Sequence, residues 1–130
     1  MQKYYCYCSE TFKKSLKKYR KKHTITNKEI DIFQKSLVIN PLRGNVIPRY
    51  DVLRKIRLAV ESLNVGKSDG YRVIYSVVYE KNSTNIFLWQ LYYKKTLKDL
   101  SDNEYKQIIE LYNNIDLDGE GFVELIPIKS

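Results

Sequence analysis

Residues 54–75 read RKIRLAVESLNVGKSDGYRVIY, two strand-like runs separated by a loop over 64–70. In the first run, Ile56, Leu58 and Val60 share one face, whereas Lys55 and Arg57 point to the other, because side chains alternate along a strand. The second run, which continues to residue 79, is rich in β-branched and aromatic residues. This stretch predicts a β-hairpin that gathers five cations, namely Arg54, Lys55, Arg57, Lys67 and Arg72.

Further strands are predicted on both sides of this hairpin. After a turn over 81–85, the run IFLWQLYYK over 86–94 reads as a third strand. Short connections between residues 52–60, 71–79 and 86–94 predict an antiparallel meander. Residues 3–8 are predicted to form a first strand, and residues 122–128 a last edge strand. The sheet should therefore be small, twisted and mostly antiparallel.

Three helices are predicted from their capping signals. Ser9 can cap a helix over 10–22, and capping boxes begin at Thr26 and Ser101. The second helix should end at Asn40, which precedes a proline. Each helix carries an apolar stripe, formed by Phe12, Leu16 and Tyr19, by Ile30, Phe33 and Leu37, and by Tyr105, Ile108, Ile109 and Tyr112.

The predicted order is therefore β-α-α-β-β-β-α, an α+β fold with an N-terminal helical hairpin and a C-terminal helix. We expect the helices to cover one face of the sheet. The other face should be open, and it should carry Lys55 and Arg57.

Length and charge suggest one domain with an anionic partner. The chain has 130 residues and a net charge of +8. Residues 1–27 carry eight Lys/Arg against one Glu, and residues 28–99 carry thirteen against seven acids. Residues 100–130 carry two against seven, so we treat 115–130 as an acidic C-terminal extension of the single 1–130 domain. The lysines of the 10–22 helix form either a solvated face or a ridge that follows phosphates.

Several classes of function are disfavoured. Cys6 and Cys8 point the same way along a strand and read as reduced, half-buried thiols of a cytoplasmic protein; a zinc site would need more ligands than they and His23 supply. His23, at the end of the lysine-rich helix, reads as a surface residue, so no Ser/His/Asp or Cys/His set is expected. No signal peptide or membrane span is expected either. We predict neither a metal nor a cofactor.

The cations of the meander predict phosphate chemistry. Lys55 and Arg57 share a face of one strand, Arg72 begins the next, and Lys94 ends the third, two residues after Tyr92. In a twisted sheet these positions can converge on one patch. Such a patch can bind a phosphodiester and stabilise the extra charge of a pentacoordinate phosphorane.

The same residues carry a resemblance to a known family. The segments GKSDGYRVIY over 66–75, IFLWQLYYK over 86–94 and DLSDNE over 99–104 are similar to those of RelE/HigB-type toxins of bacterial type II toxin–antitoxin modules, closest to the HigB-like branch. The Asn-Pro-x-x-Gly turn over 40–44 also matches. The resemblance covers about residues 10–110.

The resemblance implies a ribosome-dependent mRNA endoribonuclease, an mRNA interferase that inhibits translation by cutting mRNA in the ribosomal A site. The reaction would be a metal-free attack of the 2′-hydroxyl on the adjacent phosphorus, leaving a 2′,3′-cyclic phosphate. The implied catalytic residues are Lys55, Arg57, Arg72 and Lys94, and the implied RNA-binding residues are Arg54, Lys67, Tyr92, Tyr93 and Lys95. The partner would be an antitoxin, often with a helix-turn-helix DNA-binding domain.

Two departures leave roles open. The third-strand position is often arginine in the family, whereas Lys94 lacks a bidentate fork. Some members also use a catalytic residue near the C-terminus, where this chain is acidic. Two alternatives therefore remain: a non-nucleolytic ParE-like toxin that binds DNA gyrase, and an inactive relative that only binds RNA or its antitoxin.

Overall fold

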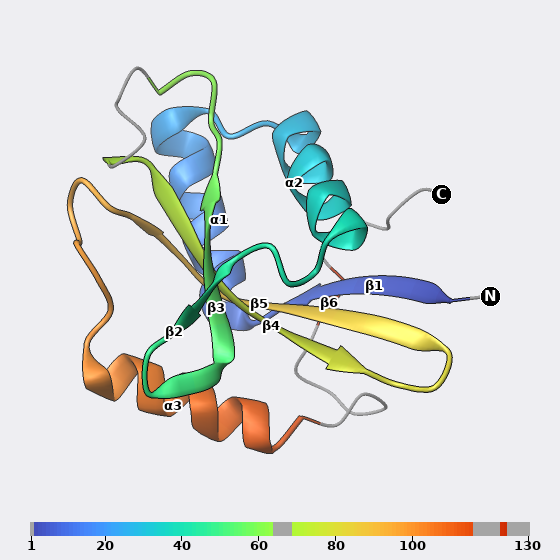
Figure 1. The fold of residues 1–130 in the computed structure, drawn as a ribbon. Helices are drawn as coiled ribbons and strands as arrows, with labels where there is room; N and C mark the ends of the chain where they lie inside the picture. Colours follow the sequence, from blue (N-terminus) through green and yellow to red (C-terminus); the bar gives the residue numbers. More distant parts are fainter. Residues whose placement is uncertain (1, 64–68, 116–122, 125–130) are drawn as a thin grey trace.

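The computed structural model describes residues 2–63, 69–115 and 123–124, which form three helices and six strands. Their order is β1 (Lys3–Cys8), α1 (Glu10–His23), α2 (Asn27–Ile39), β2 (Asn45–Ile47), β3 (Tyr50–Leu58), β4 (Tyr71–Tyr79), β5 (Ser83–Tyr93), α3 (Asp102–Asn113) and β6 (Val123–Glu124) (Figure 1). The protein is therefore α+β, with the N-terminal helical hairpin and the C-terminal helix that the sequence predicts.

The strands form one mixed sheet in the order β2-β3-β4-β5-β1-β6. The predicted meander is confirmed, since β3, β4 and β5 pair antiparallel; β1 runs parallel to β5. The register places Arg57 opposite Arg72 and Arg72 opposite Tyr92. Three cationic or aromatic side chains from successive strands thus lie side by side.

The predicted helix starts are confirmed by their caps. The Ser9 hydroxyl accepts a hydrogen bond from the Phe12 amide at 3.1 Å. Reciprocal capping boxes join Thr26 to Glu29 and Ser101 to Glu104. These bonds satisfy amides that a helix leaves unpaired at its N-terminus, and they set where α2 and α3 begin.

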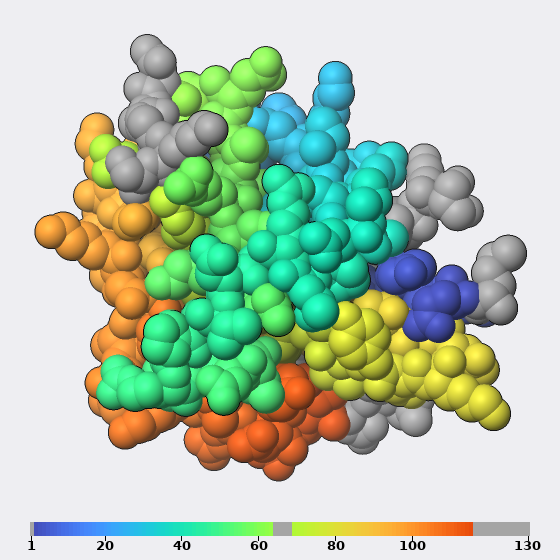
Figure 2. All heavy atoms as spheres, in the orientation of Figure 1, coloured from blue at the N-terminus to red at the C-terminus, as the bar shows by residue number. Residues whose placement is uncertain are grey.

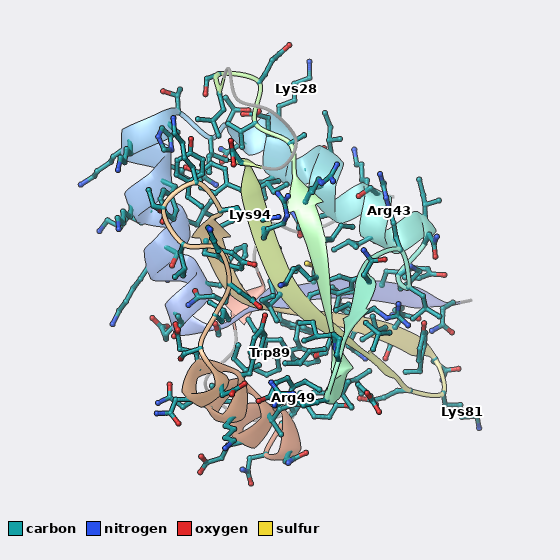
Figure 3. The ribbon with its side chains drawn as sticks, turned by 60° about the vertical axis from the view of Figure 1, so that its left-hand side comes forward. Lys28, Arg43, Arg49, Lys81, Trp89 and Lys94 are labelled. Carbon is teal, nitrogen blue, oxygen red and sulfur yellow. The ribbon has the colours of Figure 1, made fainter. Side chains whose placement is uncertain are left out.

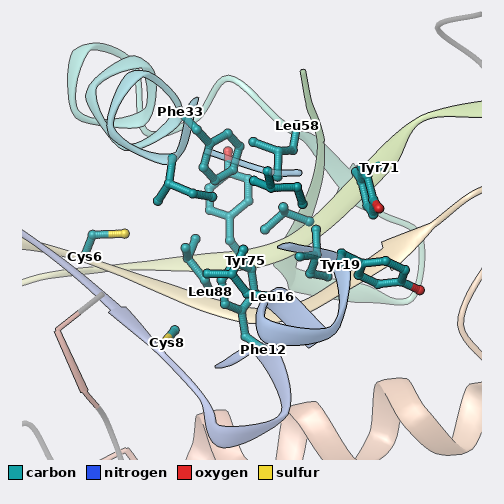
Figure 4. Close-up of a cluster of buried hydrophobic side chains, with 14 of the residues drawn as sticks. Cys6, Cys8, Phe12, Leu16, Tyr19, Phe33, Leu58, Tyr71, Tyr75 and Leu88 are labelled. Carbon is teal, nitrogen blue, oxygen red and sulfur yellow. The ribbon is translucent and has the colours of Figure 1, made fainter. Parts of the chain in front are cut away.

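One face of the sheet is covered by α1 and α2. Their apolar stripes pack on side chains of β3, β4 and β5 in a cluster that includes Tyr71, Tyr75 and Leu88 (Figure 4). Cys6 and Cys8 form no disulfide and lie in this cluster, so both point the same way, as predicted. They are fully buried rather than half-buried.

The opposite face is not open, which corrects the prediction. Helix α3 packs there, and Tyr105 and Ile108 join a second cluster with Leu53, Trp89 and other residues of the sheet. Figure 1 shows α3 below the sheet and the helical hairpin above it. Lys55 and Arg57 do lie on the α3 face, because they alternate with the partly buried Ile56 and the buried Leu58 of the other face. They are beyond the part that α3 covers.

A β-bulge in β5 decides which side Tyr92 faces. Leu88 pairs with Tyr75 and Gln90 pairs with Ile74, so β5 has one more residue than β4 at this point. The extra residue reverses the alternation beyond Trp89. As a result Trp89 and Tyr92 belong to the same cluster, and Tyr93 belongs to the other.

The single histidine is not the simple surface residue that the sequence suggested. His23 is half-buried, its Nδ1 contacts the Tyr71 hydroxyl, and its ring packs against Tyr93. Burial and the nearby Lys22 charge both lower the pKa of His23. At the end of α1, His23 therefore packs against Tyr71 and Tyr93 at the edge of the core between α1 and the sheet.

The outer side of α1 carries six lysines. These six side chains are exposed. Among the described residues, no helix is long and apolar enough to cross a membrane. Of the acidic extension over 115–130, residues 116–122 and 125–130 lie outside the described part; β6 pairs antiparallel with β1. The exposed lysines are Lys13, Lys14, Lys17, Lys18, Lys21 and Lys22.

Candidate functional site

The four predicted catalytic cations line one hollow. It has a volume of about 440 Å³, and its described lining consists of Arg43, Gly44, Asn45, Lys55, Ile56, Arg57, Arg72 and Lys94. We call this hollow the cationic pocket. Five of these eight residues are cations, and they come from β3, β4, the end of β5 and the loop after α2. The predicted convergence of separate strands on one patch is therefore present.

The pocket opens on the side where the loop after α2 approaches the sheet. Figure 2 shows α2, that loop and β3 on one face, with the segment that follows β5 beside them. Lys94 and Arg43, labelled in Figure 3, lie on either side of β3 in that view. Because Arg57 is exposed and Lys94 is half-buried, the pocket offers charge to a ligand from solvent.

Arg72 forms the inner wall of the pocket. It is only 5% exposed, and its guanidinium donates a hydrogen bond to the Tyr71 carbonyl at 3.1 Å. Burial lowers the pKa of Arg72, and the facing Arg57 lowers it further. An arginine stays protonated under such a shift, so the pair concentrates positive charge where an anion would relieve the repulsion.

Lys55 is half-buried and forms the one ion pair that the described residues place in the pocket. Its Nζ lies 2.9 Å from Oδ1 of Asp99. Within the described part of the chain, neither Arg57 nor Lys94 has an ion-pair partner. Among the described residues, the pocket lining therefore carries more cations than the Asp99 carboxylate neutralises.

The two tyrosines that end β5 have different surroundings. Tyr92 faces the Lys55 side and is 3% exposed; burial raises the pKa of its hydroxyl, while the Lys55 ammonium acts in the opposite direction. Tyr93 lies on the other face, against Tyr71 and His23. The structure thus brings only Tyr92 towards the pocket, and its buried ring suits orienting a neighbour better than stacking on a base.

Arg54 holds the pocket rim instead of lining it. Its guanidinium donates to the Leu42 carbonyl at 3.0 Å and to the Gly44 carbonyl at 2.7 Å. The Tyr75 hydroxyl donates to the Pro41 carbonyl and accepts from the Gly44 amide, both at 2.8 Å. These bonds fasten the turn over 41–44 to the sheet.

Arg43 is a pocket residue that the sequence analysis did not name among its candidates. It belongs to the fastened turn and lines the pocket. The available signal was the Asn-Pro-x-x-Gly pattern, in which Arg43 is the second variable position. Of the other predicted RNA-binding residues, Lys95 is exposed just past the pocket residue Lys94, and Lys67 lies outside the described residues.

A larger hollow adjoins the cationic pocket. It has a volume of about 900 Å³ between α2 and the end of β3, and it shares Arg43, Ile56 and Arg57 with the pocket. Its walls are mainly apolar, with Phe33 and Leu58 among them. A chain-like ligand bound in the pocket would therefore have room to continue.

The Asp99 carboxylate predicts a dependence of stability on acid pH. Partial burial raises its pKa, but hydrogen bonds from Tyr105, Lys55 and the Leu100 amide outweigh this and lower it below 3.8. The unfolded chain therefore binds the proton first, so the free energy of unfolding should fall as pH drops from about 4 through the lowered value. Urea unfolding of the wild type and of Asp99→Asn over this range checks the slope, which should be smaller in the variant. Equal slopes would contradict the prediction.

A comparison with known protein families finds no family that matches this chain.

Proposed function

We propose that this protein is a ribosome-dependent mRNA endoribonuclease, the toxin of a toxin–antitoxin pair, that works in the cytoplasm on mRNA in the ribosomal A site. The observation that carries the proposal is the cationic pocket, in which Lys55, Arg57, Arg72 and Lys94 line one hollow together with Arg43. The resemblance of the chain's sequence to RelE/HigB-type toxins supports the same function.

The proposed reaction is a transesterification. The 2′-oxygen forms a bond to the adjacent phosphorus, and its proton leaves to a base. The bond from phosphorus to the 5′-oxygen then breaks, and that oxygen takes up a proton, which leaves a 2′,3′-cyclic phosphate. Negative charge grows on the phosphoryl oxygens in between, where fixed cations stabilise it.

The pocket residues suit different parts of this reaction. Arg72, held in the wall by burial and by its bond to the Tyr71 carbonyl, is suited to pair with the phosphoryl oxygens of the scissile phosphate. Arg57 and Lys94, nearer to solvent, add charge around it. The adjoining hollow gives space for the flanking nucleotides.

Expression of the protein in growing bacteria should arrest growth and produce cleaved mRNA. Primer extension on a translated transcript is the measurement, and stops should appear within the coding sequence only when the transcript is translated. Growth arrest with intact transcripts would contradict a nuclease. Gyrase-linked DNA breaks in those cells would favour the ParE-like alternative instead.

The proposed partner is an antitoxin that neutralises the pocket or blocks entry to the ribosome. A small DNA-binding protein encoded next to this gene would support this part of the proposal. Co-expression of that neighbour should restore growth, and failure to restore it would remove that neighbour as the antitoxin.

A further inference from the structure

One carboxylate oxygen beside the cationic pocket receives three donors from three parts of the fold. Oδ1 of Asp99 accepts from Lys55 Nζ at 2.9 Å and from the Leu100 amide at 2.8 Å. It also accepts from the Tyr105 hydroxyl. The oxygen therefore joins β3, the segment after β5, and α3.

Of the groups that bond to Asp99, those of Leu100 and Tyr105 belong to buried residues, whereas Lys55 has a flexible side chain. Leu100 and Tyr105 are 6% and 3% exposed and pack in the cluster under the sheet with Leu53 and Trp89. Ser101, two residues after Asp99, caps α3. The Asp99 side chain is itself 54% exposed, but the following residue and its Tyr105 partner are held in the core. The Lys55 side chain, in contrast, has rotatable bonds that only a partner can restrain.

Lys55 needs such a partner because its other neighbours are mostly cations. Arg72 on β4, Arg57 on its own strand, Lys94 after β5 and Arg43 in the loop after α2 line the same pocket. Among the described residues, the Tyr92 hydroxyl on β5 also lies near Lys55, and the Tyr105 hydroxyl donates to the same Asp99 oxygen. Like charges would drive an unpaired ammonium out towards water.

We propose that Asp99 is a positioning residue, whose carboxylate holds the Lys55 ammonium inside the cationic pocket, where it meets the phosphodiester. The inference rests on the proposed ribonuclease function. Asp99 does not itself touch RNA, because a carboxylate against a phosphate is repelled. It acts through Lys55.

Asp99→Asn is the informative variant, because the amide keeps an acceptor oxygen for Tyr105 and Leu100 but loses the charge. The kcat for mRNA cleavage should fall roughly ten- to a hundredfold, since a catalytic group displaced by about 1 Å costs this much. KM should stay equal or fall, because a negative charge beside the RNA is removed. If Asp99 had a purely structural role, Asp99→Asn would lower the melting temperature but would not lower kcat while KM stayed equal or fell.

A double-mutant cycle tests whether the effect passes through Lys55. Cleavage of mRNA on programmed ribosomes is measured for the wild type, Asp99→Asn, Lys55→Met and the combination. Asp99→Asn should cause no further loss in the Lys55→Met background. Asp102→Asn is the matched control, because Asp102 pairs with Arg49, which does not line the cationic pocket. The kcat and KM of Asp102→Asn should equal those of the wild type.

The outcomes separate this inference from the proposed function. Unchanged kcat in Asp99→Asn, or full additional losses in the double variant, would overturn the role of Asp99 while cleavage by the wild type stands. Intact mRNA with the wild type would overturn the proposed function and the inference with it. If Asp99→Asn does not fold, Tyr105→Phe serves instead, because it removes one hydrogen bond to the same oxygen. Tyr105→Phe should lower kcat in the wild-type background but not in the Lys55→Met background. Equal falls in both backgrounds would overturn the inference.

Discussion

The double variant Lys55→Ala with Arg72→Ala is expected to lose mRNA cleavage while it keeps its fold. The two cations come from adjacent strands and line the same pocket, so their removal takes away charge where the phosphorane would form. Loss of one such electrostatic contact costs about 10²–10³ in rate, and residues that act as a unit are not additive; we expect a fall of roughly 10³-fold or more. Single-turnover cleavage on programmed ribosomes is the measurement.

The control for this variant removes two lysines away from the pocket. Lys106 on α3 and Lys81 in the turn between β4 and β5 are exposed and do not line it, so their double alanine variant matches the change in net charge. It should cleave at a rate close to that of the wild type. Retained cleavage in Lys55→Ala with Arg72→Ala would remove both residues from the site. Equal losses in both variants would mean that only net charge matters.

Gly44→Ala is expected to destabilise the protein and to disturb the pocket rim. A Cβ at position 44 would lie 2.7 Å from Cε1 and 2.8 Å from the hydroxyl oxygen of Tyr75, and 3.0 Å from the Lys55 carbonyl. Tyr75 is fully buried and bonded to the turn on both sides, so it cannot move away cheaply. The free energy of unfolding should fall by about 1–3 kcal/mol, as measured by urea denaturation.

Gly70→Ala provides the matched control for that change. At this position the nearest atom to an added Cβ is a guanidinium nitrogen of Arg72 at 4.0 Å, an ordinary contact. Its stability should therefore equal that of the wild type within about 0.5 kcal/mol or rise slightly, because alanine restricts the unfolded chain. A Gly44→Ala protein as stable as Gly70→Ala would show that the turn over 41–44 is not held as closely as we describe.

Local sequence signals predicted most of the elements because each has a cause within a few residues. Ser9, Thr26 and Ser101 form caps with their own helices, and the strand that ends at Tyr79 is marked by its β-branched and aromatic residues. Strand β2 was missed because it has three residues and exists only through its pairing with β3. Nothing within 45–47 distinguishes it from a loop.

The arrangement of the layers depends on contacts that periodicity does not encode. The stripe of α3 was read correctly, but the stripe cannot tell which face of the sheet it covers. In the fold, Tyr105 packs under Leu53 and Trp89, and this closes the face that was expected to be open. The same limit hid the parallel pairing of β1 with β5.

The residues that line the cationic pocket were predicted only in part, for a related reason. Alternation along β3 placed Lys55 and Arg57 together, and strand pairing brought Arg72 beside them. Tyr93 was named together with Tyr92 because the bulge at Trp89 and Gln90, which decides the face of each tyrosine, leaves no clear pattern in the sequence. Arg54 was expected to contact RNA, but it bonds to the turn over 41–44, and that turn presents Arg43 to the pocket.

The most direct test of the cationic pocket as a phosphodiester-cleaving site is the chemistry of the cut ends. Purified protein is added to ribosomes that hold a defined mRNA codon in the A site, and the fragments are analysed by mass spectrometry. We predict a 2′,3′-cyclic phosphate on the upstream fragment and a 5′-hydroxyl on the downstream one, with neither formed by Lys55→Ala with Arg72→Ala. Intact mRNA, or fragments with a 3′-hydroxyl and a 5′-phosphate, would contradict this assignment.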